Sequence, residues 1–189
     1  ADIDFSDFEK GNYSEEIAIK IDKIVDWLAT RNFTHLYLPE WEIPTIYTAI
    51  KKVKHTQGID VIIVDYFKSK SDTDAFGTYN ELGRLTDFFK NTICGGMEIA
   101  GIAGAQATET GKLADSKKIA RNASTICVLQ RKTDAEIATD GIECGNSKLK
   151  VVFNRNGGQM GANEYIDLQF NGNRISYKDA KQHTVISPY

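Results

Sequence analysis

The chain contains a nearly unbroken apolar run, Ile59 to Val64, that ends abruptly at the carboxylate of Asp65. A β-branched run without polar alternation is typical of a strand that is buried on both faces of a parallel sheet. Similar apolar runs cover residues 99–103 and 125–129. We therefore predict a parallel sheet built from these segments, with both faces of the 59–64 strand covered.

Helices are predicted before and between these strands, where apolar residues recur at helical spacing. Ser14 is a plausible helix start, and Pro44 stands where the first turn of a helix tolerates proline. The apolar stripes consist of Ile17, Ile21, Ile24 and Leu28; of Ile46, Ile50 and Val53; and of Tyr79, Leu82, Leu85 and Phe89. We expect Lys51, Lys52 and Lys54 to point outward from the second of these helices.

The carboxyl-terminal part of the chain has a different texture. Residues 148–154, 165–170 and 174–177 look like strands separated by Gly-rich turns, with no helix between them. A further short strand is predicted over residues 33–38. The pattern as a whole predicts an α/β fold in a single domain, residues 1–189, with a mostly parallel sheet flanked by helices and a β-meander at its end.

Composition limits the possible classes of protein. Hydrophobic residues make up 41% and charged residues 26% of the 189 residues, and no apolar stretch is long enough for a membrane span. The cysteines at 94, 127 and 144 are odd in number and far apart, which indicates a reducing compartment and no zinc site. A net charge of −3 argues against a protein that coats nucleic acid by bulk charge, but it leaves a local basic groove open.

Polar side chains follow two of the predicted strands. A carboxylate at the end of a buried strand, as at Asp65, lies at the edge where open α/β sheets bind ligands, and in nucleotide hydrolases that position holds magnesium. Gln106 follows the 99–103 strand, where an amide can contact a γ-phosphate or the attacking water. A buried strand whose Asp65 caps the next turn is the simpler alternative.

Basic residues occur at two other places. The polar loop 107–118 carries Lys112, Lys117 and Lys118, with Arg121 just beyond it, and such a loop can contact a phosphate backbone or be an ordinary solvated surface loop. Arg155 ends a strand just before a tight turn. An arginine presented in this way can act as a finger on the nucleotide of a neighbouring subunit, or it can be a surface hairpin residue.

Taken together, these residues resemble the ATPase domain of the replicative hexameric helicases of the DnaB family. Val61 to Tyr66 is similar to the second motif of that family, and Ile102 to Gln106 is similar to its third. The stretch from Leu113 to Arg131 resembles the helix and strand that follow its DNA-binding loop, and Asn154 to Gly157 matches its final motif. With Gly11 to Glu16 and the helix after it, the resemblance covers nearly the whole chain.

The resemblance implies a RecA-like fold and an ATP-dependent helicase that moves on single-stranded DNA and unwinds duplex DNA as a hexameric ring. The implied cofactors are ATP and Mg²⁺, and the implied partners are single-stranded DNA, other copies of the chain, and a primase or loader in the cytoplasm of a bacterium or a phage-infected host. The implied site residues are Asp65 for magnesium and catalysis, Gln106 and Arg155 for catalysis, these three with Asn156 for the nucleotide, and Lys112, Lys117, Lys118 and Arg121 for DNA.

Departures from the family pattern are equally informative. The 189 residues contain no G-x-x-x-x-G-K-[ST] loop, and the strand before that loop is central in a RecA-like sheet. Phe153 stands where the family usually has a lysine, and Ala114, Lys117 and Gly158 replace other common residues. We therefore expect the carboxyl-terminal part of a divergent helicase, encoded by a phage or mobile element, that is inactive by itself and lacks the central strand.

Two other classes remain open. A recombinase or clock-type ATPase of the RecA class shares the strands that end at Asp65 and Gln106, although the turn at Arg155 fits the helicases better. A DNA-binding or assembly module that has lost nucleotide chemistry would explain why the chain contains no phosphate loop.

Overall fold

The computed structural model describes residues 3–11, 13–39, 42–67, 75–105, 116–161 and 163–183, and it describes side chains from residue 81 and from residue 119 onward in the two segments that begin at 75 and 116. The chain forms two compact units. Residues 34–126 form one unit, and residues 1–33 together with 127–189 form the other. This division by packing leaves the single-domain expectation untested. Among the described residues, no helix is long and apolar enough to cross a membrane.

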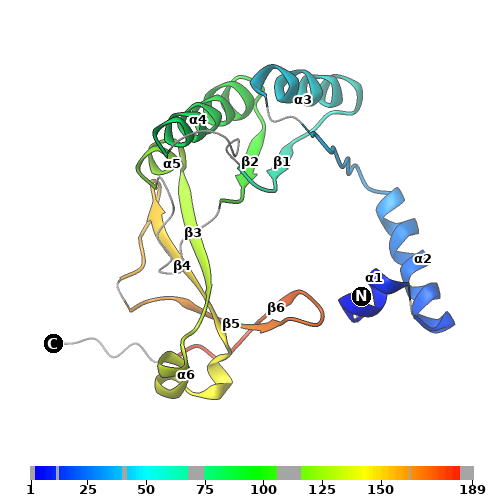
Figure 1. Ribbon diagram of the computed structural model, residues 1–189, viewed down its shortest axis with the longest axis vertical. Helices are drawn as coiled ribbons and strands as arrows, with labels where there is room; N and C mark the ends of the chain where they lie inside the picture. Colours follow the sequence, from blue (N-terminus) through cyan, green and yellow to red (C-terminus); the bar gives the residue numbers. More distant parts are fainter. Residues whose placement is uncertain are drawn as a thin grey trace. The chain divides into compact units, whose positions relative to one another are not determined.

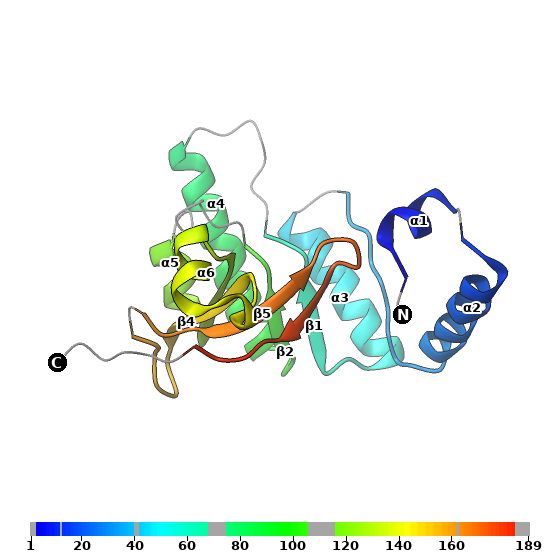
Figure 2. The same ribbon diagram turned by 90° about the horizontal axis from the view of Figure 1, so that it is seen from below.

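The unit of residues 34–126 is a small parallel sheet with helices on it (Figure 1). Its elements are α3 (Ile43–Gln57), β1 (Val61–Val64), α4 (Ala75–Asp87), the π-helix η1 (Phe88–Gly95), β2 (Ala100–Ala103) and α5 (Ser116–Asn122). Strands β1 and β2 lie side by side in both views and pair in parallel, with Val61 opposite Ala100 and Val64 opposite Ala103 (Figure 2). The parallel pairing of these two segments confirms the sequence prediction.

The apolar stripes of α3 and α4 form the core of this unit. Its buried cluster consists of Ile46, Ile50, Leu85, Ile93 and Ile99. Pro44 lies in the first turn of α3, as predicted, and Gly58 ends the helix with a φ of 72° that favours glycine. The expectation for Lys54 was wrong, because this side chain is half-buried and its Nζ donates to the carbonyl oxygen of Met97.

One face of the β1–β2 sheet is open, which contradicts the prediction of a strand covered on both faces. The side chains of Val61, Ile63 and Ile102 are 53%, 67% and 59% exposed, whereas Val64 on the opposite face is 8% exposed. Pairing in register places Val61, Ile63 and Ile102 on the same face, because side chains alternate along a strand. The apolar run therefore predicted a strand correctly but not its surroundings, which depend on the neighbours that pack on it.

The other unit is dominated by an antiparallel meander (Figure 1). Its elements are α1 (Phe5–Lys10), α2 (Glu15–Ala29), β3 (Thr125–Arg131), α6 (Asp134–Asp140), the 3-10 helix η2 (Ile142–Cys144), β4 (Ser147–Asn154), β5 (Ile166–Asn171) and β6 (Ser176–Asp179). The strand order is β3-β4-β5-β6, with antiparallel pairs β4–β5 and β5–β6, and the unit boundary falls within β3. The predicted β-meander is confirmed.

Local signals explain the ends of the helices in this unit. The hydroxyl of Ser14 accepts from the backbone N–H of Ile17, which confirms the predicted start of α2. At α6, Thr133 and Glu136 form a reciprocal capping box. The described segment 33–38 is not a strand, contrary to expectation. A β-prone segment becomes a strand only where a neighbouring strand supplies the ladder hydrogen bonds.

Candidate active site

Asp65 lies at the carboxyl edge of the parallel sheet. The ladder between β1 and β2 continues one step beyond the strands, because the N–H of Gly104 donates to the carbonyl of Val64 at 2.9 Å. The N–H of Phe67 then donates to the carbonyl of Gly104 at 3.1 Å. These bonds hold the segment that contains the exposed Asp65 against the segment that leads to residue 106.

A glycine at position 104 allows this close approach. A Cβ atom added at Gly104 would lie 3.2 Å from Cβ of Tyr66, which is tighter than ordinary van der Waals contact. The two chain segments thus leave the sheet in contact with each other. Gln106 and Lys112 lie outside the described residues, so their predicted roles remain predictions.

The predicted DNA-contacting residues lie partly on a helix rather than a loop. Residues 116–118, expected at the end of the loop, begin α5, which therefore carries Lys117, Lys118 and Arg121. Its carboxyl-terminal end is joined to the α4–η1 segment, since Asn122 Nδ2 donates to Thr86 Oγ1 at 3.3 Å. The predicted contact of these basic residues with DNA is not tested by this geometry.

Arg155 lies at the tip of the turn that follows β4. The turn is closed by Asn154, whose Oδ1 accepts from the N–H of Asn156 at 3.3 Å and whose Nδ2 donates to the carbonyl of Gly158 at 3.4 Å. A Cβ atom at Gly157 would lie 2.7 Å from Nδ2 of Asn154, so the turn requires glycine there. Arg155 and Asn156 are both exposed, at the position predicted from the sequence.

The site residues are divided between the two units. Asp65 and the chain leading to residue 106 belong to the unit of residues 34–126, and Arg155 and Asn156 belong to the other unit. Within one unit, the structure therefore brings together the neighbourhoods of Asp65 and Gln106, as the parallel pairing predicted. The roles of Asp65, Gln106, Arg155 and Asn156 in binding and catalysis remain predictions.

A buried cluster of charges in the meander unit escaped the sequence analysis. The side chain of Lys132 is fully buried, and its Nζ lies 2.7 Å from Oδ2 of Asp140 and 3.0 Å from the carbonyl of Cys144. It also forms an ion pair with Oδ1 of the fully buried Asp167. Tyr165 completes the group by donating its hydroxyl proton to Oδ2 of Asp140 at 2.7 Å.

Mutual attraction in this cluster sets the ionisation of its members. Burial alone would raise the pKa of Asp167 and of Asp140, but the bonds from Lys132 outweigh it and lower both pKa values. Burial alone would lower the pKa of Lys132, and the two carboxylates reverse that effect and raise it. Burial and the neighbouring carboxylate of Asp140 also raise the pKa of Tyr165. The cluster is thus held in its charged form.

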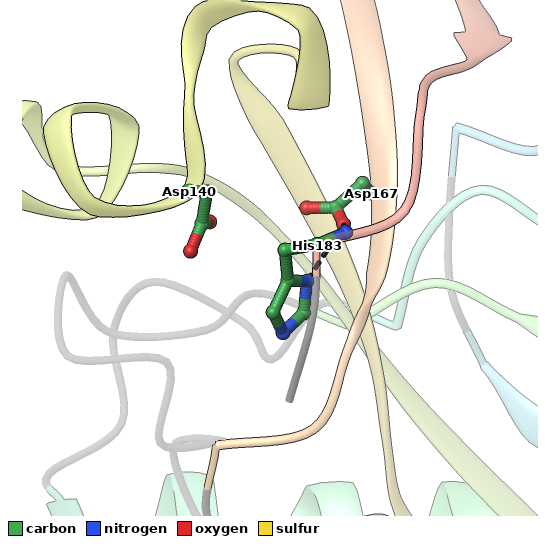
Figure 3. Close-up of side chains that lie close together, drawn as sticks. All are labelled: Asp140, Asp167 and His183. Atoms are coloured by element: carbon green, nitrogen blue, oxygen red, sulfur yellow. Dashed lines mark hydrogen bonds and ion pairs between the residues drawn. The ribbon is translucent and has the colours of Figure 1, made fainter. Parts of the chain in front are cut away.

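Asp140, Asp167 and His183 are spaced like metal ligands, with one ligand atom from each within 4.8 Å of the others (Figure 3). The ammonium group of Lys132 already pairs with both carboxylates. Oδ1 of Asp167 makes no other bond in the described structure, so this ion pair is what compensates its burial. We assign the cluster to structure, because a bound cation would have to displace Lys132.

Comparison with known proteins identifies the fold. The chain matches the solved structure of the ATPase domain of a DnaB-like phage helicase, with a TM-score of 0.71 at 12% sequence identity. The match covers 95% of this chain and 66% of that one, so the chain spans slightly less than two-thirds of the matched domain. No family model and no curated protein matches the sequence. The similarity confirms the RecA-like α/β fold class, and at this level of identity it shows the fold alone.

Proposed function

We propose that this chain is the carboxyl-terminal part of the ATPase core of a DnaB-like replicative helicase. The observation that carries the proposal is the edge of the parallel sheet, where bonds through Gly104 place Asp65 beside the chain that leads to Gln106. In ATPases of this fold, a carboxylate and an amide at that edge contact the magnesium and the γ-phosphate of one nucleotide. The fold match to an ATPase domain supports this interpretation.

In this proposal Asp65 holds Mg²⁺, directly or through water, and Gln106 senses the γ-phosphate. Arg155 reaches the nucleotide of the adjacent subunit with Asn156 beside it. A planar, permanently charged guanidinium suits this role, because it stabilises the charge that spreads over a phosphoryl group during transfer. Lys112, Lys117, Lys118 and Arg121 bind the phosphates of single-stranded DNA. The phosphate loop that binds ATP must come from outside these 189 residues.

A mixing experiment in the complete protein tests this division of labour. Asp65→Asn and Arg155→Ala subunits should each lose ATPase activity, by about 10³–10⁵-fold for a missing finger. Mixed rings should recover part of the activity, because some shared sites then combine an intact Asp65 with an intact Arg155. Mixed rings that form but are no more active than either mutant would contradict the role of Arg155 in trans.

The second candidate is a DNA-binding or assembly module without nucleotide chemistry. The observation in its favour is that the 189 residues contain no phosphate-loop motif. The Asp65→Asn variant separates the two candidates. An ATPase requires a large loss of turnover with unchanged folding, whereas a module without nucleotide chemistry has no turnover to lose and keeps its DNA affinity. A recombinase-type ATPase would lose turnover as well but would lack strand separation in the unmutated protein.

A further inference from the structure

The segment that follows β6 is fastened to a single residue of β5. The backbone N–H of Ala180 donates to the carbonyl of Asp167 at 3.3 Å. The side chain of Gln182 brackets the same residue, accepting from the N–H of Asp167 at 2.9 Å and donating to its carbonyl at 3.1 Å. Residues 180–183, which we call the carboxyl-terminal clamp, therefore lie along β5 in a fixed register.

His183 closes this clamp onto the buried charge cluster (Figure 3). Its backbone N–H and its Nδ1 both lie against Oδ2 of Asp167, at 2.6 and 2.7 Å. The other carboxylate oxygen of Asp167 pairs with Lys132. Because Asp167 is fully buried and held from both sides, it is a rigid anchor for the imidazole ring.

The same ring also contacts the loop that carries Arg155. This loop runs from the end of β4 to the start of β5, and Asn163 and Tyr165 lie on its returning arm. The ring of Tyr165 stacks on that of His183, with 4.2 Å between the centroids and 29° between the planes. Nε2 of His183 faces the carbonyl oxygen of Asn163 at 3.4 Å. A ring that carries a proton on both nitrogens can donate to both of its acceptors.

The rest of the loop is folded on itself. The N–H of Met160 donates to the carbonyl of Val151 at 3.2 Å, and the N–H of Gly161 donates to Oε2 of Glu164 at 2.7 Å. The loop therefore moves largely as one piece, and the contacts of His183 with Asn163 and Tyr165 join its returning arm to the clamp.

We propose that His183 is a positioning residue for Arg155. The clamp ties the imidazole to the buried anchor Asp167, and the imidazole in turn fixes the direction in which the loop presents Arg155. This inference rests on the proposed function of Arg155 as a finger. Small displacements of a catalytic group are costly, since a shift of about 1 Å can reduce turnover by about 10²-fold.

The test is His183→Phe in the complete protein, because phenylalanine keeps the stacking on Tyr165 and removes both ring N–H donors. Turnover of ATP should fall by about 10- to 100-fold while the KM for ATP and ring assembly stay unchanged. Amide hydrogen exchange over residues 156–164 should become faster. Adding Arg155→Ala to His183→Phe should cause less further loss than Arg155→Ala causes alone, because the two residues act as one unit.

Matched variants separate this role from a general loss of stability. His35→Phe changes an exposed histidine and should leave turnover and exchange unchanged. Gln182→Ala removes only the bracket around Asp167, so it should give an intermediate loss, and it replaces His183→Phe if that variant does not fold. Unchanged turnover in folded His183→Phe rings, or fully multiplicative losses, would overturn the inference. Full activity of Arg155→Ala would overturn the proposed finger and its positioning together, an outcome that Arg155→Ala alone reveals.

Discussion

The two units of the chain solve the problem of burial in opposite ways. The unit of residues 34–126 has an apolar core, in which Ile50, Leu85 and Ile93 are at most 3% exposed. The meander unit buries Lys132, Ser147 and Asp167 beside the apolar Val128 and Cys144. Apolar contacts are non-directional and tolerate repacking, whereas a buried charge is stable only when each partner is in place. The meander is therefore the more specific and the more fragile of the two.

The sharpest way to break this contrast is Lys132→Met. The substitution leaves Asp140 and Asp167 buried without a countercharge, so we expect a loss of about 3–5 kcal/mol in the free energy of unfolding of the meander unit. Site-resolved hydrogen exchange at β5 measures the loss in that unit alone. The control is Lys181→Met, which removes an exposed ion pair with Glu143 and should have a much smaller effect. Equal losses in both variants would mean that the buried network contributes no special stability.

In the apolar unit the corresponding substitution is Ile93→Ala. The side chain of Ile93 is fully buried, so its truncation should cost about 3 kcal/mol through lost burial and a residual cavity. Ile63→Ala removes the same atoms from the open face of β1, where the side chain is 67% exposed, and should cost far less. Denaturant unfolding compares the two variants. A cost for Ile63→Ala as large as that for Ile93→Ala would show that the open face is covered in the complete protein.

Acid distinguishes the units by a smaller effect. The folded state lowers the pKa values of Asp140 and Asp167, so their contribution is fully present above the unfolded-state pKa and is lost as the pH falls through the folded-state pKa. From pH 5 to pH 3 we expect the meander to lose at most ~1 kcal/mol per carboxyl group. The core around Ile93 contains no such pair among its described residues and should be less sensitive. Hydrogen exchange at both pH values, followed separately in β5 and α3, measures the difference.

The same contrast explains what could be predicted from the sequence. Strands β1, β2 and β4 and the stripe of α3 follow from local periodicity, because the apolar spacing is set by the geometry of each element. The shared edge of Asp65 and Gln106 followed from the rule for carboxyl ends of parallel strands. Segment 33–38 and the open face of β1 were misjudged, since both depend on neighbours that no local pattern encodes.

The charge network was invisible for a related reason. Lys132, Asp140, Asp167 and His183 are far apart in the sequence, and each taken alone looks like an ordinary polar residue. The histidines were expected to be surface or packing residues, and the half-buried His183, stacked on Tyr165, agrees with that view. Its attachment to Asp167 depends on the meander register, which pairs Lys148 with Asp167 and places the end of the chain alongside β5. Only the assembled fold supplies that information.

The buried network also constrains how this chain can change during evolution. Removing any one of Lys132, Asp140 or Asp167 leaves a buried charge without its partner, so single substitutions are strongly disfavoured. Replacing the whole group at once by apolar side chains of similar volume can be neutral or even stabilising. Relatives of this chain should therefore keep all of these positions or exchange them together. A sequence that has exchanged them would also have lost the anchor that His183 needs.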